Sequence, residues 1–460
     1  MDPFLLTHRV TDALFDIGPG FTPPSLRDQT IRGWLLADKA AKSGIIGPSK
    51  PLLVVGAGLA GTVTALTAAS LNVPTTVIDL ADKPLNVQLG CYSRVLCPAQ
   101  YDWPANHWSD ECLPWTIKIP LSWRQGKAGY LALALGREFL DQVESMPLLT
   151  FLPHTQVPID ERKALKDRNP QGDFPINFLD VHTGALDPNG PYRFAAVFSC
   201  LGPGVERSSL NKYSGFRFWE LDPFSEPNLN LNPSDTPKVY ISGGGDGALQ
   251  DFLRIATNRE TAKEVFLSLP VKVRETIQHK IQAKEENFKR SHSWFVRADH
   301  DIHQQIQDHQ SKTIDEVLDK HETELHKVLG PMLSHLSKLT LRLAYRCDHF
   351  TNYYCLNGIL TLLVTRYWER TTGTNLLLPR TETVEVRGIN FHHCDNKPWD
   401  CHGKNHEVVL RTSSCHSTTP STTVAGIFNV VILRYGPELP SESFFGLPVH
   451  TRRQLLPYYL

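Results

Sequence analysis

The 460-residue sequence predicts an α/β fold built on parallel sheets, with two glycine-rich strand–turn–helix units and a helical insertion. Three observations support this prediction. Residues 51–78 contain no charged residue and place an Ala- and Thr-rich segment between two short apolar runs. A strand-like run at 238–242 also leads into consecutive glycines. Residues 258–346 are rich in Lys, Glu, Gln, His and Leu and nearly free of glycine, a composition typical of solvated helices.

The elements of the first half follow from local composition. Helix-forming residues at 25–42 predict a helix before a Gly/Pro-rich link. The run Leu-Leu-Val-Val at 52–55 predicts a buried parallel strand. A helix at 62–71 and a strand at 75–78 then complete one βαβ unit. Residues 84–128 are irregular and rich in Trp, Pro, Cys and Tyr, and a helix is expected at 129–145.

The second half alternates between strands and helices. Strands are expected at 194–200 and 238–242, helices through 258–346 and near 357–368, and further strands at 382–388, 407–411 and 428–434. The Ser/Thr-rich stretch 412–423 is expected to be a surface loop. Because the chain is longer than one ordinary core accommodates, we expect two or three structural units.

A glycine motif directly follows the first strand. Residues 56–61 have the spacing G-x-G-x-x-G, in which Gly56 permits a tight turn, Gly58 lets backbone N–H groups approach a diphosphate, and Gly61 allows close helix–strand packing. The helix that follows offers unpaired N–H groups to an anion. The second strand ends at Asp79, whose carboxylate can accept hydrogen bonds from a ribose. The expected contacts are Gly56, Gly58, Leu59, Ala60, Gly61 and Asp79.

This motif resembles the N-terminal FAD-binding fingerprint of the flavoproteins with two dinucleotide-binding domains. That superfamily includes thioredoxin-reductase-like disulfide reductases, flavin monooxygenases and amine oxidases. Ala60 is typical of the group, whereas Asp79 stands where Glu is usual. The resemblance implies a Rossmann-like FAD-binding domain. Together with the changes in composition along the chain, it predicts an N-terminal helical extension (1–50), a first FAD-domain part (51–210), an NAD(P)-binding-like unit (211–257), a helical region (258–374) and a C-terminal FAD-domain part (375–460).

Later glycines extend the resemblance. Strands that end near Gly202 and Gly436 are similar to the strand and small-residue turn that lie beside FAD in this superfamily. Gly243, Gly245 and Asp246 belong to a Gly-Gly-Gly-Asp turn that resembles the start of the NAD(P)H domain in thioredoxin-reductase-like enzymes. No short strand with a ribose-reading acid or a phosphate-reading arginine is recognisable after residue 257. This second turn is therefore either a nucleotide site or a scaffold turn.

Several side chains between the first βαβ unit and residue 108 are candidates for chemistry. Arg94 suits either a diphosphate or substrate carboxylate, or a structural ion pair. Tyr101 and His107 lie in an aromatic cluster that suits a flavin-facing wall, with His107 as a proton shuttle; the alternative is packing on the core. Cys91 and Cys97 have five residues between them, one more than the redox disulfide of glutathione-reductase-like enzymes, so they are a redox pair or two packed cysteines.

Other classes of function and site are disfavoured. The formal net charge of −1 argues against a general nucleic-acid binder. The first residues lack a secretory pattern, and residues 51–78 fit a buried βαβ unit better than a membrane span. The nine scattered cysteines favour a reducing cytoplasm. The His and Cys residues at 392–406 lack a compact zinc spacing, so no metal is expected.

These observations predict an FAD-dependent oxidoreductase that transfers hydride to or from flavin N5, with NADPH or NADH as the donor and a small organic molecule as the substrate. Reductase and monooxygenase types remain open. One alternative is an amine or amino-acid oxidase in which the second glycine turn is only structural. The other is a nucleotide-binding interaction protein without enzymatic activity, with residues 258–346 as a surface for a protein partner.

Overall fold

The computed structural model describes residues 2–18, 20–22, 25–112, 119–165, 173–220, 237–292, 300–389, 405–412, 421–449 and 452–453. Its helices are α1 (Pro3–His8), α2 (Leu26–Lys42), α3 (Leu59–Ser70), α4 (Ala128–Ser145), α5 (Ile159–Ala164), α6 (Asp246–Thr257), α7 (Ala262–Ser268), α8 (Val271–His292), α9 (His300–Lys320), α10 (Glu322–Leu333) and α11 (Cys355–Thr372).

The strands of the first half are β1 (Leu14–Asp16), β2 (Phe21–Thr22), β3 (Leu52–Val55), β4 (Thr75–Ile78), β5 (Val95–Leu96), β6 (Gly126–Lys127), β7 (Leu149–Leu152), β8 (Thr155–Gln156), β9 (Phe174–Ile176), β10 (Leu179–Asp180), β11 (Tyr192–Phe194) and β12 (Ala196–Ser199). Those of the second half are β13 (Val205–Glu206), β14 (Ser209–Leu210), β15 (Tyr213–Ser214), β16 (Lys238–Ser242), β17 (Thr340–Ala344), β18 (Leu377–Leu378), β19 (Thr381–Ile389), β20 (Asn405–Thr412), β21 (Ser421–Phe428), β22 (Val430–Leu433), β23 (Pro437–Glu438) and β24 (Arg452–Arg453).

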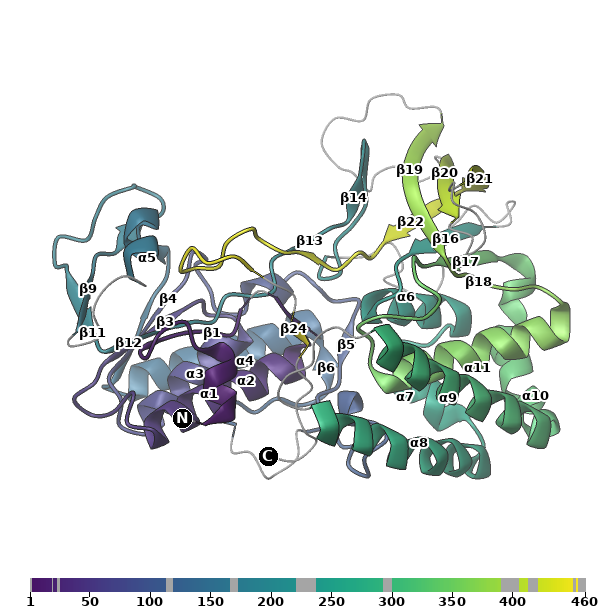
Figure 1. Cartoon of the computed structure of the whole chain (residues 1–460), viewed down its shortest axis with the longest axis horizontal. Coiled ribbons are helices and arrows are strands. Elements are labelled where there is room, and N and C mark those ends of the chain that lie inside the picture. Colours follow the sequence, from purple (N-terminus) through teal and green to yellow (C-terminus); the bar gives the residue numbers. More distant parts are fainter. Residues whose placement is uncertain are drawn as a thin grey trace.

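The first unit is built on a parallel sheet with the strand order β1-β12-β3-β4-β7. Helices α1 to α4 gather on one side of it (Figure 1). All four residues of β3 are buried, as expected for a central strand covered on both faces. The α/β prediction and the βαβ unit from β3 to β4 are thereby confirmed.

The second unit contains another parallel sheet, with the order β18-β17-β16-β22. Helices α6 to α11 pack beside it with their own apolar core (Figure 1). The three antiparallel strands β19-β20-β21 cover part of this sheet through a smaller core that includes Tyr240, Val408 and Val431. In the described part of the chain, the two larger parallel sheets therefore belong to separate units, each with its own main core.

Residues 1–50 are part of the first unit rather than a separate extension. Helix α2 was predicted, and it begins at the N-cap Ser25, whose Oγ accepts from the N–H of Asp28 at 3.0 Å. Strand β1 was not predicted, and it forms the edge of the first sheet beside β12. Three residues carry too little periodicity to mark a strand, so only the pairing with β12 shows it.

The expectation that residues 375–460 complete the first unit is corrected for most of that range. Strand β22 pairs with β16 in the second sheet. Of the residues described in this range, only those after β23 return to the first unit, where Phe444 and Phe445 join its core. The chain passes from the first unit to the second through β13 and returns through β23. These two strands pair antiparallel, so the two connections lie side by side (Figure 1). An apolar run predicts a strand but not its partner, which is decided by non-local hydrogen bonds.

The helical stretch 258–346 ends in a strand that was not expected. Helices α7 to α10 are inserted between α6 and β17, and β17 lies parallel to β16. The strand that the sequence pattern does not reveal after residue 257 is therefore β17, which follows four inserted helices. The loop predicted at 412–423 is wrong for residues 421–423, which belong to β21. Residues 413–420 lie outside the described part.

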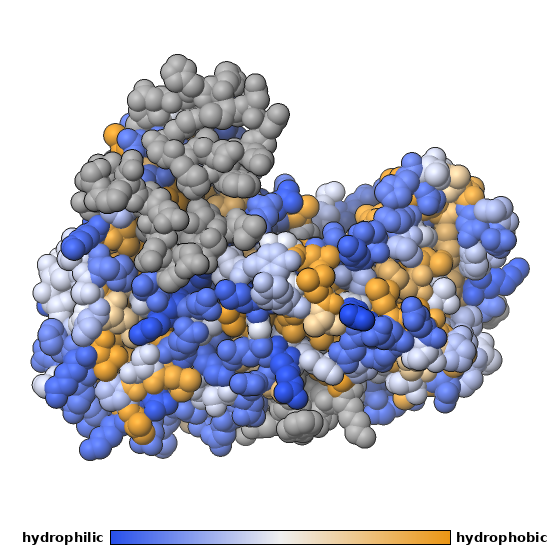
Figure 2. All heavy atoms as spheres, turned by 180° about the vertical axis from the view of Figure 1, so that it is seen from behind, coloured by the Kyte–Doolittle hydropathy of each residue, from blue (hydrophilic) through white to orange (hydrophobic). Residues whose placement is uncertain are grey.

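Seen from behind, most of the coloured surface is hydrophilic, and apolar residues lie in small groups between polar ones (Figure 2). Among the described residues, no helix is both long and apolar enough to cross a bilayer.

Candidate functional site

One large cavity joins the two units and contains both glycine turns. Its volume is about 1540 Å³, larger than the roughly 300–1,000 Å³ typical of small-molecule sites. Both turns follow a parallel strand at its carboxyl end, where ligands of open α/β sheets bind. The predicted residues that line the cavity are Gly56, Gly58, Leu59, Ala60, Asp79, Tyr101, Gly202, Gly243, Gly245, Asp246 and Gly436.

The first turn needs its glycines for three different reasons. Gly56 has φ +101°, a region that favours glycine. A Cβ on Gly61 would lie 1.8 Å from the carbonyl oxygen of Gly56, so Gly61 does not line the cavity but lets α3 approach the turn. A Cβ on Gly58 would meet no atom within 4 Å, so open space lies against the start of α3. The turn thus leaves room for an anion at a helix N-terminus.

Asp79 lies at the end of β4 and braces the first turn. Its Oδ2 accepts from the N–H of Ala57 at 2.5 Å, and its Oδ1 accepts from the N–H of Ala81 at 2.8 Å. A carboxylate has about four acceptor positions, so both oxygens retain capacity for a further donor. Because Asp79 also lines the cavity, it can accept from a ribose hydroxyl as well as hold the turn.

The second turn repeats this plan. Helix α6 begins after Gly245, which has no side chain to cap it. Asp246 is the first residue of α6, and its Oδ1 accepts from the backbone N–H of Tyr354 at 3.0 Å and from Asn357 Nδ2 at 2.7 Å. Gln250 donates to its Oδ2 at 2.6 Å. Burial raises the pKa of the Asp246 carboxyl, and these donors oppose that rise. Asp246 thereby joins the second turn to the start of α11.

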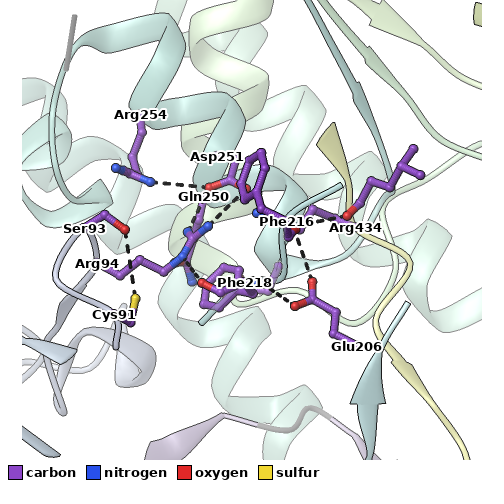
Figure 3. Close-up of polar contacts among 12 residues, drawn as sticks. Cys91, Ser93, Arg94, Glu206, Phe216, Phe218, Gln250, Asp251, Arg254 and Arg434 are labelled. Atoms are coloured by element: carbon purple, nitrogen blue, oxygen red, sulfur yellow. Dashed lines mark hydrogen bonds and ion pairs between the residues drawn. The ribbon is translucent and has the colours of Figure 1, made fainter. Parts of the chain in front are cut away.

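Arg94 does not line the cavity but belongs to a buried inter-unit ionic cluster, which we define as Arg94, Asp251, Arg434 and Glu206 (Figure 3). Its Nη1 donates to Asp251 Oδ1 at 2.8 Å, and its Nε donates to the carbonyl oxygen of Phe218 at 2.5 Å. Its guanidinium lies 3.6 Å from the centre of the Phe218 ring. Of the alternatives left open by the sequence, this geometry matches the structural ion pair.

The cluster joins elements that are far apart in the chain. The carbonyl oxygen of Arg94 accepts from the N–H of Ala128 at the start of α4, which anchors Arg94 in the first unit. Asp251 lies on α6, and Arg434 follows β22. Burial would raise the pKa of the Asp251 carboxyl, but the guanidiniums of Arg94 and Arg434 outweigh it and hold the pKa well below its usual range.

Tyr101 and His107 are separated by the structure. Tyr101 lines the cavity, where its ring centre lies 4.4 Å from that of Tyr354. His107 does not line it, and its Nε2 lies 2.8 Å from Asp102, which also pairs with Arg27 at 2.7 Å. The role of His107 as a proton shuttle stays a prediction, and His107 is not among the residues that line the cavity.

The two cysteines weighed as a redox pair lie outside the cavity lining. Cys91 and Cys97 are both buried, and neither lines the cavity. No group of three or more metal-ligating side chains occurs within the described part of the chain. His406 is described, but residues 392–394 and 401–402 of the weighed zinc pattern lie outside that part.

Two contributors to the cavity were missed by the sequence analysis. Ser25, Leu26 and Gln29 from the start of α2 line it, although residues 1–50 showed no ligand-binding pattern. Arg346 also lines it, two residues after β17. Recognising 340–344 as an apolar alternating strand would have identified Arg346, because the position after the second strand of such a unit faces the ribose.

Comparisons with known proteins gave matches among solved structures. No protein-family model and no curated protein sequence matches the chain. The thioredoxin reductase of Lactococcus lactis, in its FR conformation, is 8% identical at a TM-score of 0.35, with 84% of this chain and 78% of that one covered. The bacillithiol disulfide reductases of Bacillus cereus and Staphylococcus aureus are 10% and 11% identical, each at a TM-score of 0.36, with 84% of this chain and 78% and 76% of theirs covered. Because these scores are low, the chain is assigned to the parallel α/β class from its own strand pairing and glycine turns.

Proposed function

We propose that this chain is an FAD-dependent oxidoreductase that accepts hydride from NADPH and passes the electrons to a small organic substrate. The observation that supports it is the single cavity shared by two glycine turns, each at the carboxyl end of a parallel strand and at the start of a helix. When bound, FAD supplies the hydride-transfer chemistry. The residues of this chain bind the two nucleotides, orient them toward each other and exclude water.

The first turn fits the flavin nucleotide. The open space against Gly58 accommodates a diphosphate beside the N–H groups of α3, and Asp79 is placed for the adenosine ribose. Leu85, Tyr101 and Leu201 supply apolar and aromatic surface to the same cavity, as the flat ring of a flavin requires.

The second turn fits the hydride donor, and Arg346 favours NADPH over NADH. Arg346 follows the strand next to β16, where an arginine accommodates the 2′-phosphate of NADP. Its side chain is 80% exposed and lies 4.0 Å from Glu382, a weak ion pair that leaves the guanidinium accessible.

The visible spectrum of the purified protein tests this proposal first. We expect flavin absorbance, release of FAD on heating, and bleaching by NADPH without oxygen. Gly58→Val should abolish FAD retention, because its side chain would occupy the diphosphate space, where a Cβ meets no neighbouring atom within 4 Å. Gly47→Val is the matched control: that site is equally open, lies outside the cavity and should leave FAD bound.

The other outcomes separate the alternatives. Bound flavin that no nicotinamide reduces, with peroxide formed from an amine, would favour an amine oxidase. A folded protein that takes up no flavin would refute the proposal and leave the non-enzymatic interpretation.

A further inference from the structure

We propose that Gln29, on helix α2, binds FAD directly and makes the N-terminal segment part of the flavin site. This inference rests on the proposed function and adds a residue from outside the glycine motifs. The starting observation is that Gln29 lines the cavity and is only 7% exposed. Its amide Nε2 is buried without a hydrogen-bond partner in the described part of the chain.

An unpartnered buried amide is costly and therefore informative. The large majority of buried side-chain polar atoms in proteins are hydrogen-bonded, so each exception calls for an explanation, such as a functional role or a bound water or ion. The two ends of a glutamine amide exchange by a half-turn of the last side-chain torsion, so Gln29 can offer either a donor or an acceptor to the cavity. Its neighbour Asp28, by contrast, accepts a hydrogen bond on each carboxylate oxygen, one from Arg27 and one from the hydroxyl of Tyr354.

The packing of α2 places Gln29 beside the first glycine turn. Gly33 lies one helical turn after Gln29, so the two share a face of α2 about 6 Å apart along the axis. A Cβ on Gly33 would lie 2.4 Å from the carbonyl oxygen of Ala60, in the first turn of α3. Thr64 Oγ1 also donates to the carbonyl oxygen of Gly33 at 3.1 Å. The face that carries Gln29 is thus pressed against the helix whose N-terminus faces the diphosphate space (Figure 1).

The first turn of α2 is also held from the second unit. The hydroxyl of Tyr354, which precedes α11, donates to Asp28 Oδ2 at 2.5 Å. Arg27 pairs with Asp102 at 2.7 Å, and both side chains are buried. Because Tyr354 holds Asp28 and Asp102 holds Arg27, the neighbouring Gln29 is positioned before a ligand enters. Such a positioned, unsatisfied amide matches the polar ribityl or ring edge of a flavin that extends from the diphosphate into the cavity.

The test is flavin affinity and stability measured separately for Gln29→Leu. Apo-protein, freed of flavin, is titrated with FAD by fluorescence quenching, and its thermal unfolding is followed without ligand. Loss of one neutral hydrogen bond should weaken FAD binding roughly 2- to 12-fold. Apo stability should be equal to wild type or higher, because the leucine removes an unpaired polar group. Unchanged FAD affinity would overturn the inference, whatever the midpoint of the apo-protein.

Gln310→Leu is the matched control. Gln310 is 1% exposed, but its amide is hydrogen-bonded at both ends: Nε2 donates to Cys355 Sγ at 3.2 Å and Oε1 accepts from Tyr353 at 3.1 Å. It does not line the cavity. This variant should show the opposite pattern, with a lower apo midpoint and unchanged FAD affinity.

A second variant covers the case in which Gln29→Leu does not fold. Gln29→Glu keeps the shape but places a carboxylate against the ligand, so FAD affinity should fall at neutral pH and recover as the pH is lowered and the carboxyl protonates. Affinity equal to wild type across that range would also overturn the inference. If wild-type protein binds no FAD, the proposed function fails; if it binds FAD and Gln29 variants bind equally well, only this inference fails.

Discussion

Replacing Arg94 with methionine tests whether the inter-unit ionic cluster holds the two units together. Arg94 and Asp251 are 3% and 0% exposed, so water cannot replace the lost contacts. The change removes two hydrogen bonds to Asp251, at 2.8 and 3.3 Å, and one to the carbonyl oxygen of Phe218. Methionine retains an apolar side chain of similar length against the Phe218 ring, so packing is largely preserved.

The expected cost is about 3 kcal/mol in the free energy of unfolding. Breaking a buried ion pair by removing one partner typically costs about 3–5 kcal/mol, because the other charge is left uncompensated. Here Arg434 Nε still donates to Asp251 at 2.8 Å, and Arg254 lies 3.6 Å from it. The remaining arginines therefore place the cost at the lower end of that range.

Urea unfolding followed by circular dichroism measures this cost. At a slope of roughly 2–3 kcal/mol per M, the midpoint should fall by about 1 M. Arg370→Met is the control, since Arg370 pairs with Asp315 and Asp319 at the surface and its loss should cost less than about 1 kcal/mol. Equal midpoints for the two variants would show that the cluster is not an inter-unit support.

Further predictions follow from single contacts. Gly61→Ala should yield little folded protein, because its Cβ would collide with the backbone of Gly56; normal yield and flavin content would contradict the close approach. Arg346→Ser should raise the KM for NADPH while leaving that for NADH nearly unchanged, measured by flavin reduction; equal effects on both would exclude a 2′-phosphate contact. Burial raises the pKa of the Cys200 thiol to about 12, so iodoacetamide at pH 8 should not label Cys200 in folded protein, as judged by peptide mass spectrometry. Because the pKa of Asp251 is lowered in the folded protein, its ionised carboxylate stabilises the fold above a pH of about 4, and this stabilisation is lost as the pH falls further. Asp251→Asn should therefore make the free energy of unfolding less dependent on pH in the acid range.

Local sequence patterns were sufficient for the first glycine turn and its strand. The run at 52–55, the spacing of Gly56, Gly58 and Gly61 and the acid at Asp79 all depend on neighbouring residues, and each was found where the structure has it. Arg94 and His107 show the limit of such patterns. Both lie soon after the first βαβ unit, yet Asp251 and Asp102 hold them outside the cavity lining.

The sequence by itself determined the two strand–glycine–helix units, because hydrophobic periodicity and glycine spacing act within a dozen residues. The tertiary structure alone decided that β1 and β22 join different sheets, that β17 continues the second unit beyond four inserted helices, and that α2 lines the shared cavity. The physical reason is that strand partners and buried charge pairs form between residues far apart in the chain. Their choice depends on hydrogen bonding and burial in the folded protein, which no short segment encodes.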